Sequence, residues 1–234
     1  MPSPPPAAPT ARRRRGVVSL TAVTVLCALI ALVSVGAYVG LDPDESRVGL
    51  RPWALHYPFL VVHVMCSVIA LVTAPLQLWP ALRRGGAHRV IGRIHLFAGV
   101  FPGAVSGLVV AVMSTYGPIA QTGFILLAVL WFTTAAAGWR AVRGGRYADH
   151  RKWMVRAFSL TMAGVMLRVL LPLSMAALAP LMGPEYGEED LFVAVYPAIA
   201  WLCWVPNLLI AELYLRRRGR TDVREPAPAG DVRG

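Results

Sequence analysis

The placement of the basic residues is the feature of this sequence that most restricts its fold. Of the 23 lysines and arginines, 20 fall into four clusters, at residues 12–15, 83–93, 140–156 and from 216 onward. Apolar runs alternate with these clusters, and each is about 20 residues long, enough for a helix to cross a hydrocarbon core about 30 Å thick. The six runs begin near Gly16, Pro58, His95, Gln121, Ala157 and Leu191. The sequence therefore predicts an all-α, polytopic membrane protein with six transmembrane helices.

The charges of the loops predict the orientation of these helices. All four basic clusters fall on one side of the membrane, whereas the opposite loops hold two arginines, Arg47 and Arg51, beside seven acidic residues. Loops rich in Lys and Arg stay on the cytoplasmic side. We therefore expect both termini to lie in the cytoplasm.

The composition leaves no room for a soluble domain of useful size. The 234 residues are 56% hydrophobic and 15% charged. We expect a six-helix transmembrane domain at residues 16–216, between a disordered basic tail at 1–15 and a disordered tail at 217–234. The net charge of +11 would suggest nucleic acid in a soluble protein. Here the cytoplasmic loops explain the charge, so the expected partners are the bilayer and its anionic lipids, with no nucleic acid.

Two cytoplasmic turns share a sequence pattern. Arg-Gly-Gly-Ala-His-Arg at 84–89 precedes the third span, and Arg-Gly-Gly-Arg-Tyr-Ala-Asp-His-Arg at 143–151 precedes the fifth; Arg93 and Arg156 follow. Both turns connect an inward-running helix to an outward-running one, so a duplication would relate them by an axis along the membrane normal. The pattern predicts a parallel internal repeat and a central four-helix core of spans two to five. A chance likeness between two Arg/Gly-rich turns is the alternative.

Small residues and prolines predict how the spans pack. Gly99, Gly103 and Gly107 recur at four-residue spacing, which lets another helix approach closely in lipid. Prolines that free a backbone carbonyl and favour kinks lie inside four of the runs, at Pro75, Pro102, Pro172 and Pro206. The sequence shows no obvious pair of broken helices, the feature on which many carriers build their sites.

Polar side chains inside the apolar runs are candidates for function, because each is costly in hydrocarbon unless satisfied. They are His63, Arg168, Asn207 and Glu212. Arg168 is predicted near the midplane, facing the interior, where a bound anion, carbonyls freed by Pro172, or His63 and Asn207 would compensate its charge. Glu212 precedes Arg216 by one helical turn, and a local ion pair is expected.

His63 lies on a weakly polar stripe of the second span that is expected to face the bundle; the other members are Ser67, Ala70, Ala74 and Gln77. A single interhelical hydrogen bond would satisfy the imidazole. His56, two turns earlier, is expected to be solvated at the outer interface.

Three further histidines, His88, His95 and His150, are predicted near the cytoplasmic face, the first two on one helix face. Neutral imidazole is the commonest metal donor in proteins, so this set could bind a metal or a haem. Alternatively, the three side chains bind lipid phosphates or cap helix ends. The sequence has no phosphate-binding glycine loop, no Cys-x-x-Cys and no His-Glu-x-x-His, which argues against the chemistries of soluble enzymes.

Several segments resemble a known family: Gln77 with Arg83, His88-Arg89-Val90-Ile91-Gly92-Arg93, His150-Arg151-Lys152-Trp153-Met154-Val155-Arg156, Arg168, and Trp204-Val205-Pro206-Asn207-Leu208-Leu209-Ile210-Ala211-Glu212. They look like the bacterial predicted membrane proteins catalogued as domain of unknown function 2306, over roughly residues 59–216. The resemblance implies a polytopic protein of the bacterial cytoplasmic membrane with unassigned activity. Its shared motifs are the His-Arg-x-x-Gly-Arg and His-x-x-Trp-Met-x-Arg turns.

Two classes of function fit these observations. The first is a redox protein that binds b-type haem within the four-helix core, or a quinone between Arg168 and His63. Bis-histidine ligation requires two imidazoles facing each other, and the fourth span contains no histidine, so a diheme protein is not expected. The second class is a non-redox carrier, a lipid or small-molecule binder, a copper or other metal-site protein, or an accessory subunit of a membrane complex.

Overall fold

The computed structural model describes residues 11–36, 38–43, 46, 48–83, 86–183 and 185–224, with the side chains of 11–15 and 219–224 excepted. Asp44, Glu45, Arg47, Arg84 and Gly85 lie outside the described residues, as do most of the two predicted tails. Helices and loops make up the described residues, which contain no strand. Six of the helical segments are long and apolar enough to cross a membrane, so the predicted all-α, six-span fold is confirmed.

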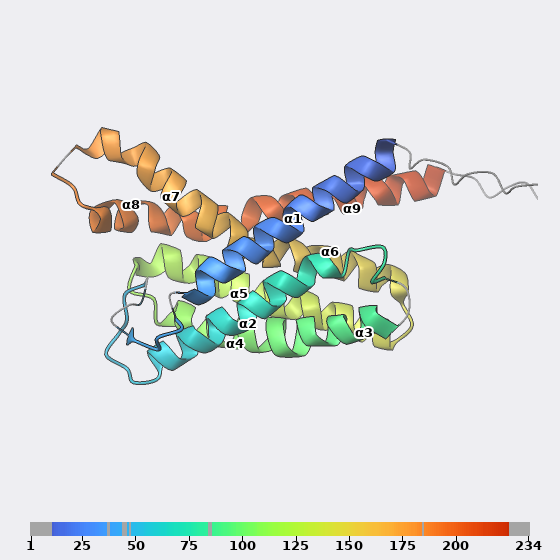
Figure 1. Ribbon diagram of the computed structural model, residues 1–234, viewed down its shortest axis with the longest axis horizontal. Helices are drawn as coiled ribbons and strands as arrows, with labels where there is room; N and C mark the ends of the chain where they lie inside the picture. Colours follow the sequence, from blue (N-terminus) through green and yellow to red (C-terminus); the bar gives the residue numbers. More distant parts are fainter. Residues whose placement is uncertain are drawn as a thin grey trace, which may run out of the picture. The chain divides into compact units, whose positions relative to one another are not determined.

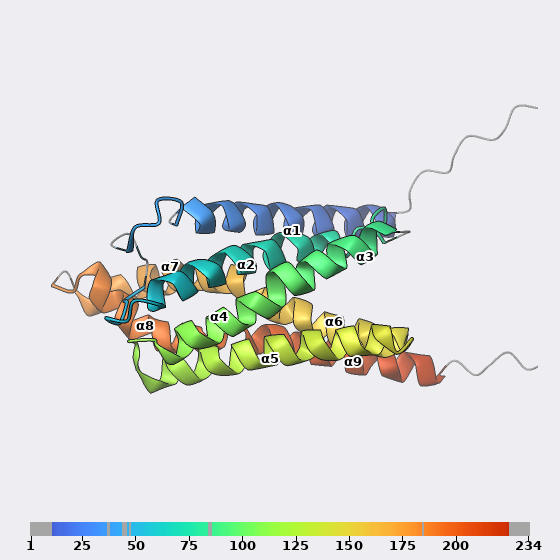
Figure 2. The same ribbon diagram turned by 90° about the horizontal axis from the view of Figure 1, so that it is seen from below.

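The chain divides into two compact units of three spans each. The first unit, Met1–Thr115, holds α1 (Ala11–Gly36), α2 (His56–Leu76) and a third span made of α3 (Gly86–Arg93), the π-helix η2 (Ile94–Val100) and α4 (Phe101–Val112). Within this unit α2 packs against α1, η2 and α4, and Figure 2 shows these elements running alongside one another. The second span and the third span therefore form a packed hairpin.

The second unit, Tyr116–Gly234, holds the other three spans. Span four is the single helix α5 (Gly117–Arg143), span five consists of α6 (Tyr147–Thr161) and α7 (Ala163–Met182), and span six of α8 (Glu188–Leu202) and α9 (Val205–Arg224). Figure 1 shows α6 and α7, and likewise α8 and α9, following one another along a span. α5 packs against α6 and α8, α6 against α9, and α7 against α8.

Spans five and six thus each contain a short interruption, at which Met162 and Cys203 keep right-handed helical backbone angles and each span remains one membrane-crossing segment. Because α6 packs on α9 and α7 packs on α8, the two interruptions lie at one level. We call this level the junction; it comprises Met162 and residues 203–204. In span six, Pro206 has no N–H to donate to the Leu202 carbonyl. Span five has no proline there, but the hydroxyls of Ser159 and Thr161 bond to carbonyls of the preceding turn, which bends helices.

The Arg-Gly-Gly turn between α5 and α6 has a physical explanation. Gly145 has φ of 71°, a left-handed conformation that glycine adopts without strain. The Arg146 N–H then donates to the Ala141 carbonyl at 2.9 Å and the Gly145 N–H to the Val142 carbonyl at 3.1 Å, which closes the end of α5. The equivalent glycine of the other turn, Gly85, lies outside the described residues.

Two predictions about organisation stay predictions. Each unit contains one hairpin of the proposed repeat, but the duplication and the four-helix core concern the relation between the units. The helices extend beyond the predicted transmembrane domain, because α1 begins at Ala11 and α9 ends at Arg224. Disorder of the remaining tails stays a prediction, since residues 1–10 and 225–234 lie outside the described residues.

Candidate functional site

His63 and the glycine stripe form the contact between the second and third spans. The His63 Nδ1 bonds to the Gly103 carbonyl at 2.8 Å. A Cβ at Gly107 would lie 2.5 Å from that nitrogen, and a Cβ at Gly99 would lie 2.9 Å from the backbone nitrogen of Ala70. The close neighbour predicted for the stripe is therefore α2, and the predicted inward face of α2 is confirmed. His63 makes an interhelical hydrogen bond, which was one of the alternatives predicted for it from the sequence.

Two other predicted histidines lie on the third span. His95 is 2% exposed, inside η2, and its Nδ1 is 3.0 Å from the Thr73 hydroxyl of α2. The Thr73 hydroxyl donates to the Ile69 carbonyl, so it accepts from the imidazole. The backbone carbonyl of His88 accepts from the Gln77 side chain at 3.4 Å. Arg93, the last residue of α3, is exposed.

The expectation that His56 is solvated is wrong. Its side chain is 1% exposed, and its Nδ1 accepts a hydrogen bond from the Arg51 N–H at 2.9 Å. The Arg51 guanidinium in turn donates to the carbonyls of Met113 and Ser114, at 2.9 and 3.1 Å. This arginine of the loop before α2 therefore satisfies the carbonyls that follow α4, and His56 holds the loop in place.

His150 lies on α6 and faces α5. Its Nδ1 is 2.9 Å from the Gly138 carbonyl, so Nδ1 carries the proton. Met154, one turn later, packs on the same glycine: a Cβ at Gly138 would lie 2.9 Å from the Met154 sulfur. His88 and His150, predicted as repeat partners, both contact the preceding span, but one does so through its backbone and the other through its ring.

The structure does not gather the histidines into a metal centre. Among the described residues, no group of three or more His, Cys, Asp or Glu side chains lies close enough together to hold a metal ion. His88 and His95 belong to the first unit and His150 to the second. Metal or haem binding by this set stays a prediction.

Side chains of span six satisfy the backbone at the junction. The Trp204 indole N–H donates to the Ala200 carbonyl at 2.9 Å, and the Asn207 amide donates to the Cys203 carbonyl at 3.0 Å. Cys203 itself is 0% exposed. Backbone groups in hydrocarbon must find partners inside the protein, and these two side chains supply them where the helix is interrupted.

Arg168 lies on α7, six residues beyond Met162. Its side chain turns back along the helix, and Nη1 donates to the Gly164 carbonyl at 3.1 Å. Gly164 is two residues from Met162, so the guanidinium lies close to the junction. Pairing with His63, with Asn207 or with an anion stays a prediction.

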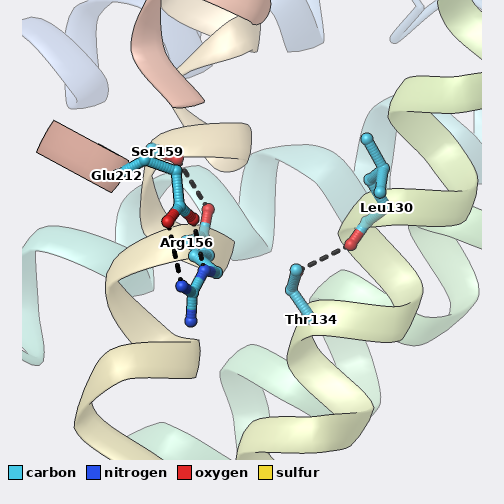
Figure 3. Close-up of polar contacts among 5 residues, drawn as sticks. All are labelled: Leu130, Thr134, Arg156, Ser159 and Glu212. Atoms are coloured by element: carbon cyan, nitrogen blue, oxygen red, sulfur yellow. Dashed lines mark hydrogen bonds and ion pairs between the residues drawn. The ribbon is translucent and has the colours of Figure 1, made fainter. Parts of the chain in front are cut away.

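Arg156 and Glu212 form an ion pair between spans five and six on the other side of the junction. Figure 3 shows the carboxylate facing the guanidinium: Nε donates to one oxygen and Nη2 to the other, the latter at 3.0 Å. The two side chains are 23% and 32% exposed. The guanidinium also lies over the Trp153 ring, 4.8 Å from its centre.

The predicted local pair of Glu212 with Arg216 is therefore wrong, because both carboxylate oxygens are bonded by Arg156, 56 residues away in the sequence. A bidentate guanidinium is geometrically the better partner for a carboxylate. Arg216 acts on Glu212 through its charge alone.

Comparison with known proteins places the chain in a family. The sequence model of a family described as "Predicted membrane protein (DUF2306)" matches residues 60–215, two thirds of the chain. The chain belongs to the DUF2306 family. The resemblance seen in the sequence is thereby confirmed over almost the expected residues. No curated protein and no solved structure matches the chain.

Two of the segments that carry the DUF2306 resemblance make helix contacts of the second unit. His150, Trp153, Met154 and Arg156 of the His-x-x-Trp-Met-x-Arg turn place α6 against α5 and α9. In the Trp204 to Glu212 segment, Trp204 and Asn207 donate to backbone carbonyls at the interruption of span six, and Glu212 supplies the carboxylate of the ion pair. The DUF2306 region thus contains a junction bordered by an arginine on each side.

The tryptophans that join α5 to its neighbours were not predicted from the sequence. The Trp131 indole donates to the Thr161 hydroxyl at 2.9 Å, and the Trp201 indole donates to the Ile119 carbonyl at 3.0 Å. A Cβ at Gly123 would lie 2.9 Å from the Trp201 nitrogen. Gly123 and Gly138, the two glycines of α5 after its first residue, were the sequence signal for these contacts.

Proposed function

We propose that the protein is a non-redox membrane carrier or binder of a small carboxylate-bearing molecule, with its site at the junction of spans five and six. The observation that supports this proposal is the pair of interrupted helices at one level. Carriers build their substrate sites from discontinuous helices near the middle of the membrane, where the interruption exposes backbone groups that a continuous helix would use internally.

Arg168 gives the proposed site its preference for anions. The guanidinium lies beside the junction, above Gly164. A guanidinium has five N–H donors in a planar fork that matches the geometry of a carboxylate. A cation at this depth is costly unless it is compensated. A bound carboxylate would provide that compensation and would be held by it.

Thermal unfolding of the detergent-purified protein with sodium benzoate, compared with sodium chloride at equal ionic strength, tests the proposal. Benzoate is expected to raise the midpoint of wild type, because a ligand that binds the folded state stabilises it. Arg168→Leu is expected to keep or raise the midpoint without ligand, since an apolar side chain replaces a partly buried charge, and to lose the benzoate effect. Arg168→Lys should lose most of it, because an ammonium lacks the planar fork.

The matched control is Arg218→Leu, which removes an exposed arginine stacked 5.1 Å from the Tyr214 ring near the end of α9. This variant should respond to benzoate as wild type does. An equal benzoate response in the Arg168→Leu and Arg218→Leu proteins would show that the anion binds elsewhere.

A haem or metal site at His150 is the second candidate. An imidazole whose Nδ1–H is held by a carbonyl presents the Nε2 lone pair, the arrangement typical of histidines that ligate metals. The bond from His150 to Gly138 has this form. A visible spectrum of the purified protein distinguishes this candidate from the carrier. A Soret band with a sharp α-band on reduction, both lost in His150→Ala, would support a b-type haem. A colourless, metal-free protein would favour the carrier.

We further propose that both termini lie in the cytoplasm of a bacterium and that anionic lipids contact the arginine-rich ends of α5, α6 and α9. The positive-inside rule supports this orientation. Reporter fusions after Arg93, Arg151 and Arg220 should then report cytoplasm, and fusions near Asp44, Pro118 and Gly187 should report the outside. A periplasmic signal at Arg220 would contradict this topology.

A further inference from the structure

The Arg156–Glu212 pair joins α6 and α9, which pack against each other. It joins spans five and six on the side of the junction that faces the Arg-Gly-Gly turn, the side proposed to be cytoplasmic. The pair holds α6 and α9 together on that side of the junction. A ligand at the junction would reach this side between α6 and α9 only after the pair breaks.

The geometry of the pair is also that of a bound substrate. Both oxygens of the Glu212 carboxylate accept from the Arg156 fork, which is how a carboxylate ligand would be held. The Trp153 ring beneath the guanidinium fixes its plane. Arg156 is thus a preformed carboxylate site that an internal carboxylate occupies.

We propose that Arg156 is a second carboxylate-binding position of the proposed carrier, and that Glu212 is its internal competitor and gate. A substrate carboxylate that leaves Arg168 replaces Glu212 on the Arg156 fork, which separates α9 from α6 and opens the cytoplasmic side. When the substrate departs, Glu212 returns and closes the path. This inference rests on the proposed function, because it assigns a route to the same site.

Cys203 offers a native reporter of the gate. Its side chain is 0% exposed at the junction, and its sulfur lies 3.8 Å from the Ala200 carbonyl. With Cys27 and Cys66 replaced by alanine, a membrane-impermeant maleimide added to inside-out vesicles reports access to Cys203 from the cytoplasmic side. The assay needs no substrate, so it can succeed or fail independently of the carrier proposal.

Glu212→Gln is expected to raise the labelling rate of Cys203 about tenfold, the change that corresponds to a loss of about 1.4 kcal/mol from the closed state. The swapped protein, Arg156→Glu with Glu212→Arg, should return the rate toward that of the parent. The control is Lys152→Gln, which breaks the exposed 3.7 Å pair with Asp149 on the same helix and should leave labelling unchanged. Equal labelling in the Glu212→Gln and Lys152→Gln proteins would overturn the gate.

Size-exclusion chromatography accompanies each variant. If Glu212→Gln aggregates, Arg156→Lys replaces it: this variant keeps the charge and loses the bidentate fork, so labelling must again rise. An unchanged rate in a monodisperse Arg156→Lys protein also overturns the gate.

Competition by Glu212 is tested with benzoate in the thermal assay. Glu212→Gln removes the competitor and should lower the benzoate concentration that gives half of the stabilisation. In the double variant with Arg156→Gln, this concentration should return to the wild-type value. An unchanged half-effect concentration contradicts a carboxylate site at Arg156. If wild type shows no benzoate effect while Glu212→Gln still exposes Cys203, the carboxylate carrier fails and the gate stands.

Discussion

The packed hairpin of spans two and three and the interrupted pair of spans five and six use polar residues in opposite ways. In the first, His63 and His95 form hydrogen bonds between two helices that glycines allow to approach closely. In the second, Trp204 and Asn207 satisfy carbonyls where a helix is interrupted, and Arg156 and Glu212 bridge two spans. Polar groups in a membrane therefore do not by themselves indicate a site, because here they serve helix packing in one unit and backbone carbonyls and an ion pair in the other.

The largest effect is expected in the packed hairpin. Gly99→Leu forces a side chain into the Ala70 backbone, which a Cβ would already meet at 2.9 Å. Overpacking of this kind typically costs about 1–3 kcal/mol, and we expect the upper end, because backbone atoms cannot move aside as a side chain can. Chemical unfolding in detergent measures the loss. Gly86→Leu on the same span, where a Cβ meets nothing within 4 Å, is the control and should stay near wild type.

The next effect tests whether the ion pair of the interrupted spans is energetically coupled. A double-mutant cycle with Arg156→Gln and Glu212→Gln is expected to give about 1–2 kcal/mol of coupling, since both groups are partly buried and bonded twice. Additive single effects would mean that the pair contributes no more than an exposed one.

A smaller effect is expected where Trp131 fastens span four to span five. Trp131→Phe removes the indole N–H that donates to Thr161, and interhelical hydrogen bonds in membranes average about 0.6 kcal/mol. Thr161→Val should cost a similar amount, and the double variant should cost no more than the larger single change. A loss of several kcal/mol would indicate that the indole supports the junction by packing as well.

The smallest effect is expected at Lys152. Its 3.7 Å contact with Asp149 joins side chains that are 58% and 49% exposed. Exposed pairs on one helix contribute about 0.3–0.5 kcal/mol, so Lys152→Ala should leave unfolding almost unchanged. A large loss would show that the basic end of α6 is covered by a further contact.

The six spans and the close contact of the third span could be predicted from local sequence patterns. Apolar runs and loop charges gave six spans, and the four-residue spacing of Gly99, Gly103 and Gly107 gave a close helix contact. The prediction that His63 faces the neighbouring helices followed from its helical spacing to Ser67 and Gln77. These features depend on residues within one or two turns of each other, where helix geometry fixes their relation.

The features that sequence analysis missed depend on distant partners. Glu212 was assigned to Arg216, one turn away, because no local pattern shows that Arg156 presents a fork to the same point. The interruption at Met162 was missed because span five has no proline there, and the hydroxyls that bend it are common in helices. His56 was expected in water because its partner is a backbone N–H of the preceding loop.

The interruption of span five also has a mechanical consequence. The buried residues of α7 are Ala163 and Val165, both in the turn that follows Met162, whereas Leu173 and Leu181 farther along are 61% and 81% exposed. α8, in contrast, is fastened to α5 by Trp201 and by Tyr196 among its aromatic neighbours. α7 also packs against α8, where Leu171 contacts the Tyr196 cluster, so α8 holds the part of α7 beyond the junction. Because Arg168 lies on α7 and Arg156 on α6, any change in the bend at Met162 would change the separation of the two guanidinium groups.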